Sequence, residues 1–87
     1  MENYDLHLEI ITPEDIVFNG TVRLVQVPGD SGTFTIMRRH SPIVAVLGNG
    51  RIRIVDESGT ENTYNCEGGV LKCQDNLVTI LLRKVSQ

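Results

Sequence analysis

Two segments decide the fold, namely Val27-Pro28-Gly29-Asp30-Ser31-Gly32-Thr33-Phe34 and Arg38-Arg39-His40-Ser41-Pro42-Ile43-Val44-Ala45-Val46-Leu47. In the first, glycine can adopt positive φ at low cost, and Asp and Ser side chains can bond to nearby backbone. This pattern predicts a tight turn between two strands. The second segment predicts a basic loop that leads into a further strand. Because both loops flank one short strand, a hairpin-like path predicts that they meet at the same rim.

Outward from these segments, alternating apolar and polar residues predict strands, and turn residues recur about every eight to twelve positions. Pro13-Glu14-Asp15 ends the first strand, and Asn19-Gly20 and Gly48-Asn49-Gly50 predict two tight turns. A bulge is expected near Gln26, which interrupts the inward-facing apolar set. No window has a helical period. The chain is therefore predicted to be all-β, an antiparallel β-sandwich with strands Leu6–Ile11, Ile16–Phe18, Thr21–Val27, Thr33–Met37, Pro42–Leu47, Arg51–Ile54, Glu61–Cys66, Val70–Gln74 and Leu77–Val85.

The length of 87 residues predicts a single domain, residues 1–87. A net charge of −3 gives no electrostatic basis for binding nucleic acid. The longest apolar run, Ile43–Leu47, is far too short to cross a membrane, and the first residues resemble no targeting peptide. Cys66 and Cys73 have the spacing of neither a metal site nor a redox motif. Because the inferred setting is cytosolic, both are predicted to be reduced on their strands, with a disulfide as the alternative.

No catalytic constellation is visible in the sequence. His40 has a hydroxyl neighbour in Ser41, but adjacent residues of a strand point to opposite faces and cannot form a nucleophile–base pair. No His, Cys, Asp or Glu cluster has the spacing of metal ligands. Gly29 and Gly32 precede a strand, whereas a phosphate-binding loop precedes a helix. We therefore expect no active site, no metal and no cofactor.

Two predicted strands are apolar on both faces, residues 43–47 and 77–82. Antiparallel sheets commonly have one solvated face. A strand that is apolar on both sides is either covered on both sides within the fold or forms a surface patch that meets a partner. The residue pattern leaves both interpretations open.

Five blocks, in this order along the chain, resemble the epsilon subunits of rotary ATP synthases. They are Val17-Phe18-Asn19-Gly20, Val27–Phe34, His40-Ser41-Pro42-Ile43, Gly50-Arg51-Ile52-Arg53-Ile54 and Gly68–Leu81. The resemblance implies a flattened barrel of two packed sheets, with about nine or ten short strands. It also implies a non-catalytic subunit of the central stalk, which couples rotation of a proton-driven membrane ring to ATP synthesis.

The implied partners are the gamma subunit and the rotor ring of c subunits, with attachment to the cytoplasmic face of a bacterial membrane only through the complex. The family uses the two loops described above, so the expected rotor-ring contact is Asp30, Ser31, Gly32, Thr33, Arg38, Arg39 and His40. The doubly apolar strand and the family motif give the expected gamma contact as Thr12, Ile43, Ala45 and Leu47.

Members of this family usually continue into two C-terminal helices, whereas this sequence ends at Gln87. The chain is then either a naturally short form, which the initial Met1 favours, or a truncated piece of a longer subunit. If it is a natural short form, we expect it neither to inhibit ATP hydrolysis by insertion nor to bind ATP. The alternative, from a different class, is a free-standing β-sandwich that binds a ligand or peptide. A small enzyme is the third possibility, which the absence of an acid–base or nucleophile pair disfavours.

Overall fold

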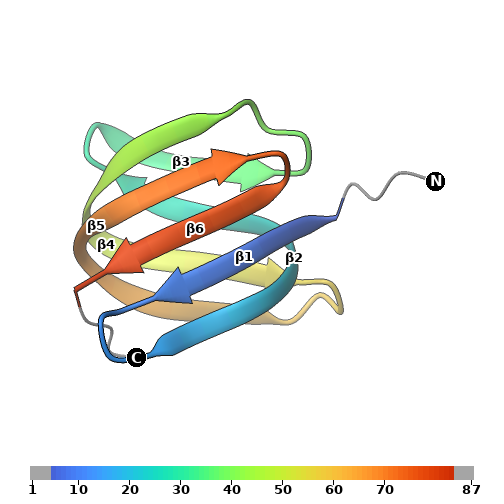
Figure 1. Ribbon diagram of the computed structural model, residues 1–87, viewed down its shortest axis with the longest axis horizontal. Helices are drawn as coiled ribbons and strands as arrows, with labels where there is room; N and C mark the ends of the chain where they lie inside the picture. The colour runs from blue at the N-terminus through green and yellow to red at the C-terminus, as the bar shows by residue number, and fades with distance from the viewer. Residues whose placement is uncertain (1–4, 84–87) are drawn as a thin grey trace.

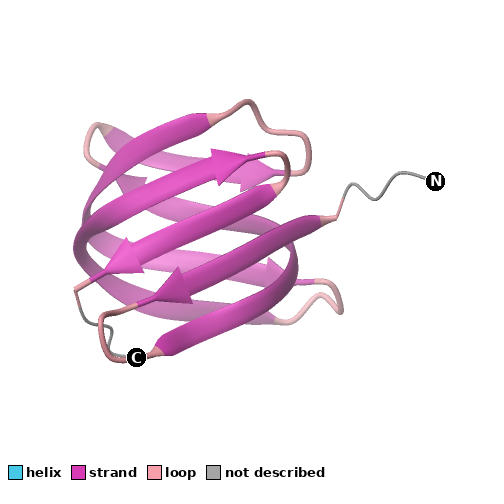
Figure 2. Ribbon diagram, in the orientation of Figure 1, coloured by secondary structure: helices cyan, strands magenta, loops and turns pink. Residues whose placement is uncertain are grey.

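A computed structural model describes residues 5–83, which form six strands joined by short loops (Figures 1 and 2). The strands are β1 (Leu6–Ile11), β2 (Ile16–Gly29), β3 (Gly32–Met37), β4 (Ile43–Asp56), β5 (Glu61–Gln74) and β6 (Leu77–Leu82). The all-β class is confirmed. Among the described residues no helix is long and apolar enough to cross a membrane.

The strands form one continuous sheet in the order β1-β6-β5-β4-β2-β3, and β1 also pairs with β2. This second pairing closes five strands into a barrel, whereas β3 continues the sheet beyond it. All neighbouring pairs are antiparallel except β1 and β6, which run parallel. Figure 1 shows the long strands β2, β4 and β5 curving around the barrel.

The six observed strands correct the prediction of nine or ten short strands, and the two packed sheets are not confirmed, because the strands form one continuous sheet. Asn19-Gly20 does not turn the chain, because both residues pair with β1. Asn49 and Gly50 likewise pair with β5 and stay within β4. Three pairs of predicted strands are thus three strands of 14 residues each. The last strand ends at Leu82, and the predicted continuation to Val85 extends outside the described residues.

Glycines occur where the long strands bend, which explains why their sequence signal resembles that of turns. Gly68 has φ of 89°, a conformation that residues with a side chain rarely adopt. At Gly50, a Cβ atom would lie only 2.8 Å from the Cβ of Pro28 on the neighbouring strand. These residues therefore permit bending and close approach inside a strand. The register of β2 against β4 shifts between Gln26 and Gly29, close to the expected bulge, but the additional residues of this irregularity lie in β4.

The core fills the barrel with inward-facing side chains from every strand. Both cysteines belong to it as free, buried thiols, as predicted. Burial raises the pKa of Cys66 and of Cys73, which keeps them protonated. The buried set is Leu6, Leu8, Ile10, Val22, Val25, Val27, Ile36, Leu47, Ile52, Ile54, Tyr64, Cys66, Leu71, Cys73, Val78, Ile80 and Leu82.

The turn between β5 and β6 ties three segments together. Asp75 and Asn76 have φ of 53° and 62°, as a two-residue hairpin turn requires. The backbone carbonyl of Asn76 accepts the N–H of His7 at 2.8 Å, which anchors the start of β1. Its side-chain Oδ1 accepts the N–H of Arg39 at 2.6 Å. The basic loop is therefore held against the β5–β6 turn.

We predict that Asn76→Gly loosens this loop without opening the turn, because glycine keeps the backbone conformation and removes only the Oδ1 acceptor. Loss of one hydrogen bond of about 1 kcal/mol should speed amide exchange at Arg39 roughly three- to tenfold. Protection of the His7 amide, which depends on the backbone carbonyl, should persist. Asp75→Gly is the matched control, and unchanged exchange at Arg39 would contradict the proposed anchoring.

The turn between β4 and β5 depends on Asp56. Its Oδ1 accepts hydrogen bonds from the Ser58 hydroxyl at 2.7 Å, from the Ser58 N–H at 3.0 Å and from the Thr60 N–H at 2.9 Å. The Ser58 side-chain bond, followed by the Thr60 backbone bond, lowers the Asp56 pKa below its ordinary value of 3.8. The ionised carboxylate therefore stabilises the folded chain.

We predict that Asp56→Ala lowers the melting temperature most at neutral pH. Because the folded-state pKa is depressed, the charge-dependent stabilisation is present above the unfolded-state pKa and is lost as the pH falls through the folded value. The difference in melting temperature between the variant and the unaltered chain should therefore narrow as the pH falls from neutral to below 3.8. Thermal unfolding followed by circular dichroism measures it, with Glu57→Gln as the control. A constant difference across this range would argue against the charge effect.

Candidate interaction surfaces

The predicted rotor-ring residues form two groups at opposite ends of β3. Asp30 and Ser31 form the β2–β3 turn, and Gly32 and Thr33 begin β3, drawn at the upper left of Figure 1. The loop that holds Arg38, Arg39 and His40 is at the upper right. The six residues of β3 span roughly 20 Å, so Asp30 and Arg38 lie at opposite ends of the strand. Both groups therefore lie along one edge of the barrel but do not form one cluster.

The basic loop has a defined conformation. Arg39 has φ of 63°, an uncommon value for a residue with a side chain, and its N–H is bound by Asn76. The Nδ1 atom of His40 lies 2.6 Å from the carbonyl oxygen of Ser41, so this nitrogen donates a hydrogen bond within the loop. Arg38 and Arg39 are exposed. The loop thus presents two guanidinium groups on a fixed backbone.

The predicted gamma-contact residues of β4 point mainly inward. Leu47 is only 3% exposed and lies in the core, and Ile43 packs against the core. Ala45 pairs with the buried Leu71 and is half-buried. The outward side chains of this strand are Val44 and Val46, which are 71% and 61% exposed. If β4 meets a partner, these two valines are the side chains available to it.

The outward valines belong to an apolar row that crosses five strands. Val46 pairs with Val70 of β5, and Val70 pairs with Leu81 of β6. Leu81 pairs with Ile11 of β1, and Ile11 pairs with Ile16 of β2. Side chains directly opposite in neighbouring strands lie about 5 Å apart at Cβ, so these five are contiguous. We call them the apolar row: Val46, Val70, Leu81, Ile11 and Ile16.

Most of this row is open to solvent. Ile16 is 62% exposed, Leu81 49% and Val70 40%, whereas Ile11 is half-buried. Thr12, the fourth predicted gamma-contact residue, follows Ile11 at one end of the row. It is fixed by the turn after β1, where its hydroxyl accepts the N–H of Asp15 at 3.1 Å. The doubly apolar β6 signalled part of this row in the sequence, but Val70 and Ile16 carried no such signal.

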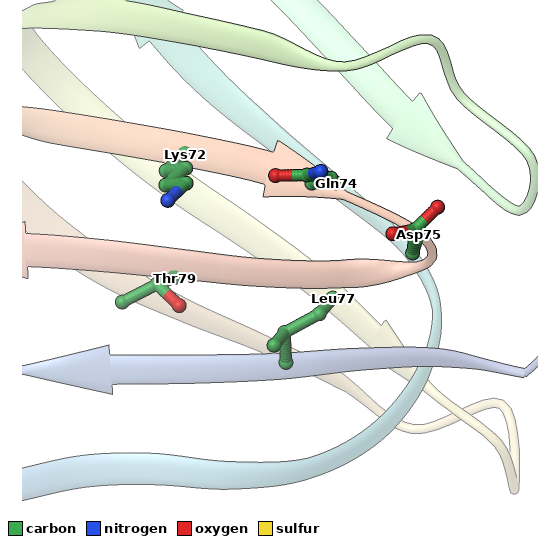
Figure 3. A pocket seen from close by; sticks show the side chains of 5 residues that line it. All are labelled: Lys72, Gln74, Asp75, Leu77 and Thr79. Carbon is green, nitrogen blue, oxygen red and sulfur yellow. The ribbon is translucent and has the colours of Figure 1, made fainter.

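Polar side chains border the apolar row. Lys72 pairs with Thr79, one step along the outer face of β5 and β6. Figure 3 shows these two residues with Gln74, Leu77 and Asp75 around a hollow of about 310 Å³ beside the β5–β6 turn. The hollow brings together one amine, one carboxylate, one amide and one hydroxyl. The described residues that line it include no histidine or cysteine.

Two further hollows lie at the ends of β3. One of about 310 Å³ lies between the β2–β3 turn and β4, lined by Gly29, Asp30, Ser31, Gly32, Phe34, Ala45 and Val46. The other, of about 380 Å³, is lined by Asp5, Thr21, Val22, Arg23, Met37, Arg38 and Glu57. Within residues 5–83, no three His, Cys, Asp or Glu side chains are grouped so that they could hold a metal ion. The distinctive surfaces are therefore the apolar row and the edge formed by β3.

Solved structures share this fold. The chain superposes on a subunit in the cryo-EM structure of Euglena gracilis mitochondrial ATP synthase, OSCP/F1/c-ring, with a TM-score of 0.89 at 17% identity, over 97% of this chain and 54% of that one. It also superposes on a chain of the Tetrahymena thermophila mitochondrial ATP synthase central stalk and c-ring, with a TM-score of 0.80 at 15% identity, over all of this chain and 69% of that one. At these identities the likeness shows the fold.

Curated relatives are more similar in sequence. An ATP synthase epsilon chain of Legionella pneumophila is 40% identical over 75 residues, which are 86% of this chain and 54% of that protein. The chain thus spans about half the length of the first such relatives. An ATP synthase epsilon chain of Chlorobium limicola is 35% identical over 79 residues, which are 91% of this chain and 90% of that protein. Residues 5–87 match the family model of the ATP synthase delta/epsilon chain β-sandwich domain, and the chain belongs to this family.

Proposed function

We propose that this chain is the non-catalytic central-stalk subunit of a rotary ATP synthase. In this function it binds the gamma subunit and the ring of c subunits, and it transmits proton-driven rotation of the ring to the catalytic part of the complex. It would act at the cytoplasmic face of a bacterial membrane, attached through the complex. Family membership and the fold support the assignment to this complex. The apolar row is the observation that carries the proposal of a protein partner.

The apolar row favours a large, permanent partner over a small ligand. It is a continuous line of side chains across five strands and forms no enclosed cavity. Burying a Val or Leu side chain completely contributes about 1.5–3 kcal/mol, so covering the exposed half of several such residues can stabilise a complex. Obligate interfaces are apolar in this way. We assign the row, together with Val44, to the gamma subunit.

The β3 edge is the proposed contact with the rotor ring. The turn at Asp30 and the loop at Arg38 lie at its two ends, and a broad ring can meet both. The charges differ between the ends, with a carboxylate at one and two guanidinium groups at the other. Such exposed contacts contribute about 0.2–1 kcal/mol each, so they orient the subunit more than they hold it.

A closed sheet suits the transmission of torque. Every strand of the barrel is hydrogen-bonded on both sides over at least part of its length, and the loops between strands are short. Bending such a structure requires breaking several backbone hydrogen bonds together. A domain of this kind can hold the gamma subunit and the ring at a fixed orientation during rotation.

Neighbouring residues of β4 test the gamma contact. Val46 points outward and Ala45 inward, so Val46→Arg should abolish co-purification with gamma and change the unfolding free energy by no more than about 0.5 kcal/mol. Ala45→Arg should instead destabilise the isolated chain, because it forces a charge toward Leu71. The assignment is wrong if Val46→Arg retains gamma while Ala45→Arg releases gamma from a chain of unchanged stability.

The ring contact is tested by reversing charge in the basic loop. Replacing Arg38 and Arg39 with glutamate should weaken attachment to the membrane ring and change its salt dependence, while the isolated chain stays folded. Arg51→Glu is the control, because Arg51 is also exposed but lies on β4, away from the loop. Binding to detergent-solubilised rings at two salt concentrations measures the effect. If the Arg38/Arg39 double variant binds the rings as well as the Arg51→Glu control does, the basic loop is not a contact.

A further inference from the structure

The edge of the sheet at β3 lacks the features that normally prevent strands of different molecules from pairing. Among the described residues β3 pairs only with β2, residue for residue and without a bulge. Its sequence, Gly-Thr-Phe-Thr-Ile-Met, contains no charged residue and no proline. Proteins usually protect an edge strand with charges, proline, bulges or a covering segment. This edge is therefore suited to pairing with another strand.

The pairing with β2 identifies which backbone groups face the open edge. Pro28 lies opposite Thr33 and has no N–H to donate, so these two residues form a non-hydrogen-bonded pair. Hydrogen-bonded and non-hydrogen-bonded pairs alternate along an antiparallel ladder. The N–H and C=O groups of Thr33, Thr35 and Met37 therefore point away from β2. They form a regular row of donors and acceptors at the edge.

The ends of β3 carry opposite charges, which makes the edge complementary to itself. Asp30 lies in the turn before the strand and Arg38 immediately after it, and both side chains are exposed. In an antiparallel pair of two β3 strands, the beginning of each strand lies beside the end of the other. Asp30 of each copy then lies near Arg38 of the other copy, and opposite charges meet twice.

More than one register sets edge-facing groups against each other, for example with either Phe34 or Thr35 opposite its own copy. With Phe34 opposite its own copy, Thr33 lies opposite Thr35 of the second copy. Only this register places Asp30 beside Arg38, so the charges favour it. A shift by one residue would set edge-facing groups against groups already bound to β2, so the alternation of the ladder disfavours it.

We propose that two copies of this chain associate through antiparallel pairing of β3 with β3, which joins their sheets across a two-fold axis. Such an interface uses the same residues on both copies. It is small, and the dimer is therefore weak and depends on concentration. The partner surface is a second copy of this chain, recognised by edge hydrogen bonds and by the two Asp30–Arg38 contacts.

This dimer covers the edge that we assign to the rotor ring, so self-association and ring attachment would compete. The dimer itself does not depend on that function. Loss of dimerisation in the purified chain would leave the ring contact untouched, and failure of ring binding would not affect the dimer. The two proposals are therefore tested separately.

Sedimentation velocity across a range of concentrations tests the proposal in the purified chain. The unaltered chain should show a reversible rise toward the mass of two chains. Asp30→Arg places arginines against arginines, and Arg38→Asp places aspartates against aspartates. Each variant alone should therefore dimerise roughly tenfold more weakly. Neither Asp30 nor Arg38 has positive φ, so the turn should tolerate Asp30→Arg and the loop should tolerate Arg38→Asp.

Mixing the two variants is the decisive measurement. In an antiparallel pair, the arginine at position 30 of one chain meets the aspartate at position 38 of the other, and the second contact is again an Arg–Asp pair. The mixture should therefore form dimers again, each made of one Asp30→Arg chain and one Arg38→Asp chain. Arg51→Asp, which alters an exposed charge away from the edge, should dimerise as the unaltered chain does.

A second variant tests the backbone contact independently of charge. Thr35→Pro removes an edge-facing N–H, and proline is tolerated on edge strands. It should abolish dimerisation even when mixed with the unaltered chain. A chain that stays monomeric at all concentrations would overturn the proposal. So would dimers that ignore charge reversal, or single variants that fail to recover on mixing although both are folded by circular dichroism.

Discussion

The double pairing of β1 is the constraint on which the rest of the structure depends. One side of β1 bonds to β2 and the other to β6, so the first strand closes the sheet. Without it, β6 and the first half of β2 would each have an exposed edge, and the core would be open along one side. The closure also completes the apolar row, because Ile11 is the link between Leu81 and Ile16.

The fold could be predicted as far as local pattern determines it. The all-β class and the turn at Asp30 follow from residues that act on their immediate neighbours. The division into short strands was wrong because glycine has two uses, to reverse a chain and to let a strand bend. Asn19-Gly20 and Gly48-Asn49-Gly50 belong to the second kind. Only their partners on β1 and β5 distinguish the two uses, and partners are not visible in a single sequence.

The candidate surfaces were less predictable, because they arise from register between strands. The sequence indicated that strands β4 and β6 are apolar on both faces, but it did not indicate which face is inward. Leu47 lies in the core and Val46 outside, although either assignment fits the pattern. The separation of Asp30 from Arg38 follows from the length of β3 and its continuation into a loop at the far end. The importance of Asn76 depends on contacts with His7 and Arg39, both remote in the chain.

The parallel alignment of β1 and β6 has a consequence for the order of events during synthesis. Among the six described strands, the ribosome releases β1 before the others and β6 after them, so β1 cannot bond to β6 until the polypeptide has emerged as far as Leu82. The β2–β3 hairpin, by contrast, needs only residues that are close together in the chain. Local hairpins should therefore form early in translation, whereas closure waits until β6 has emerged, since distant pairings are slow to form. Until then the growing chain presents open strand edges to the cell, and chaperones have their best opportunity to act on it.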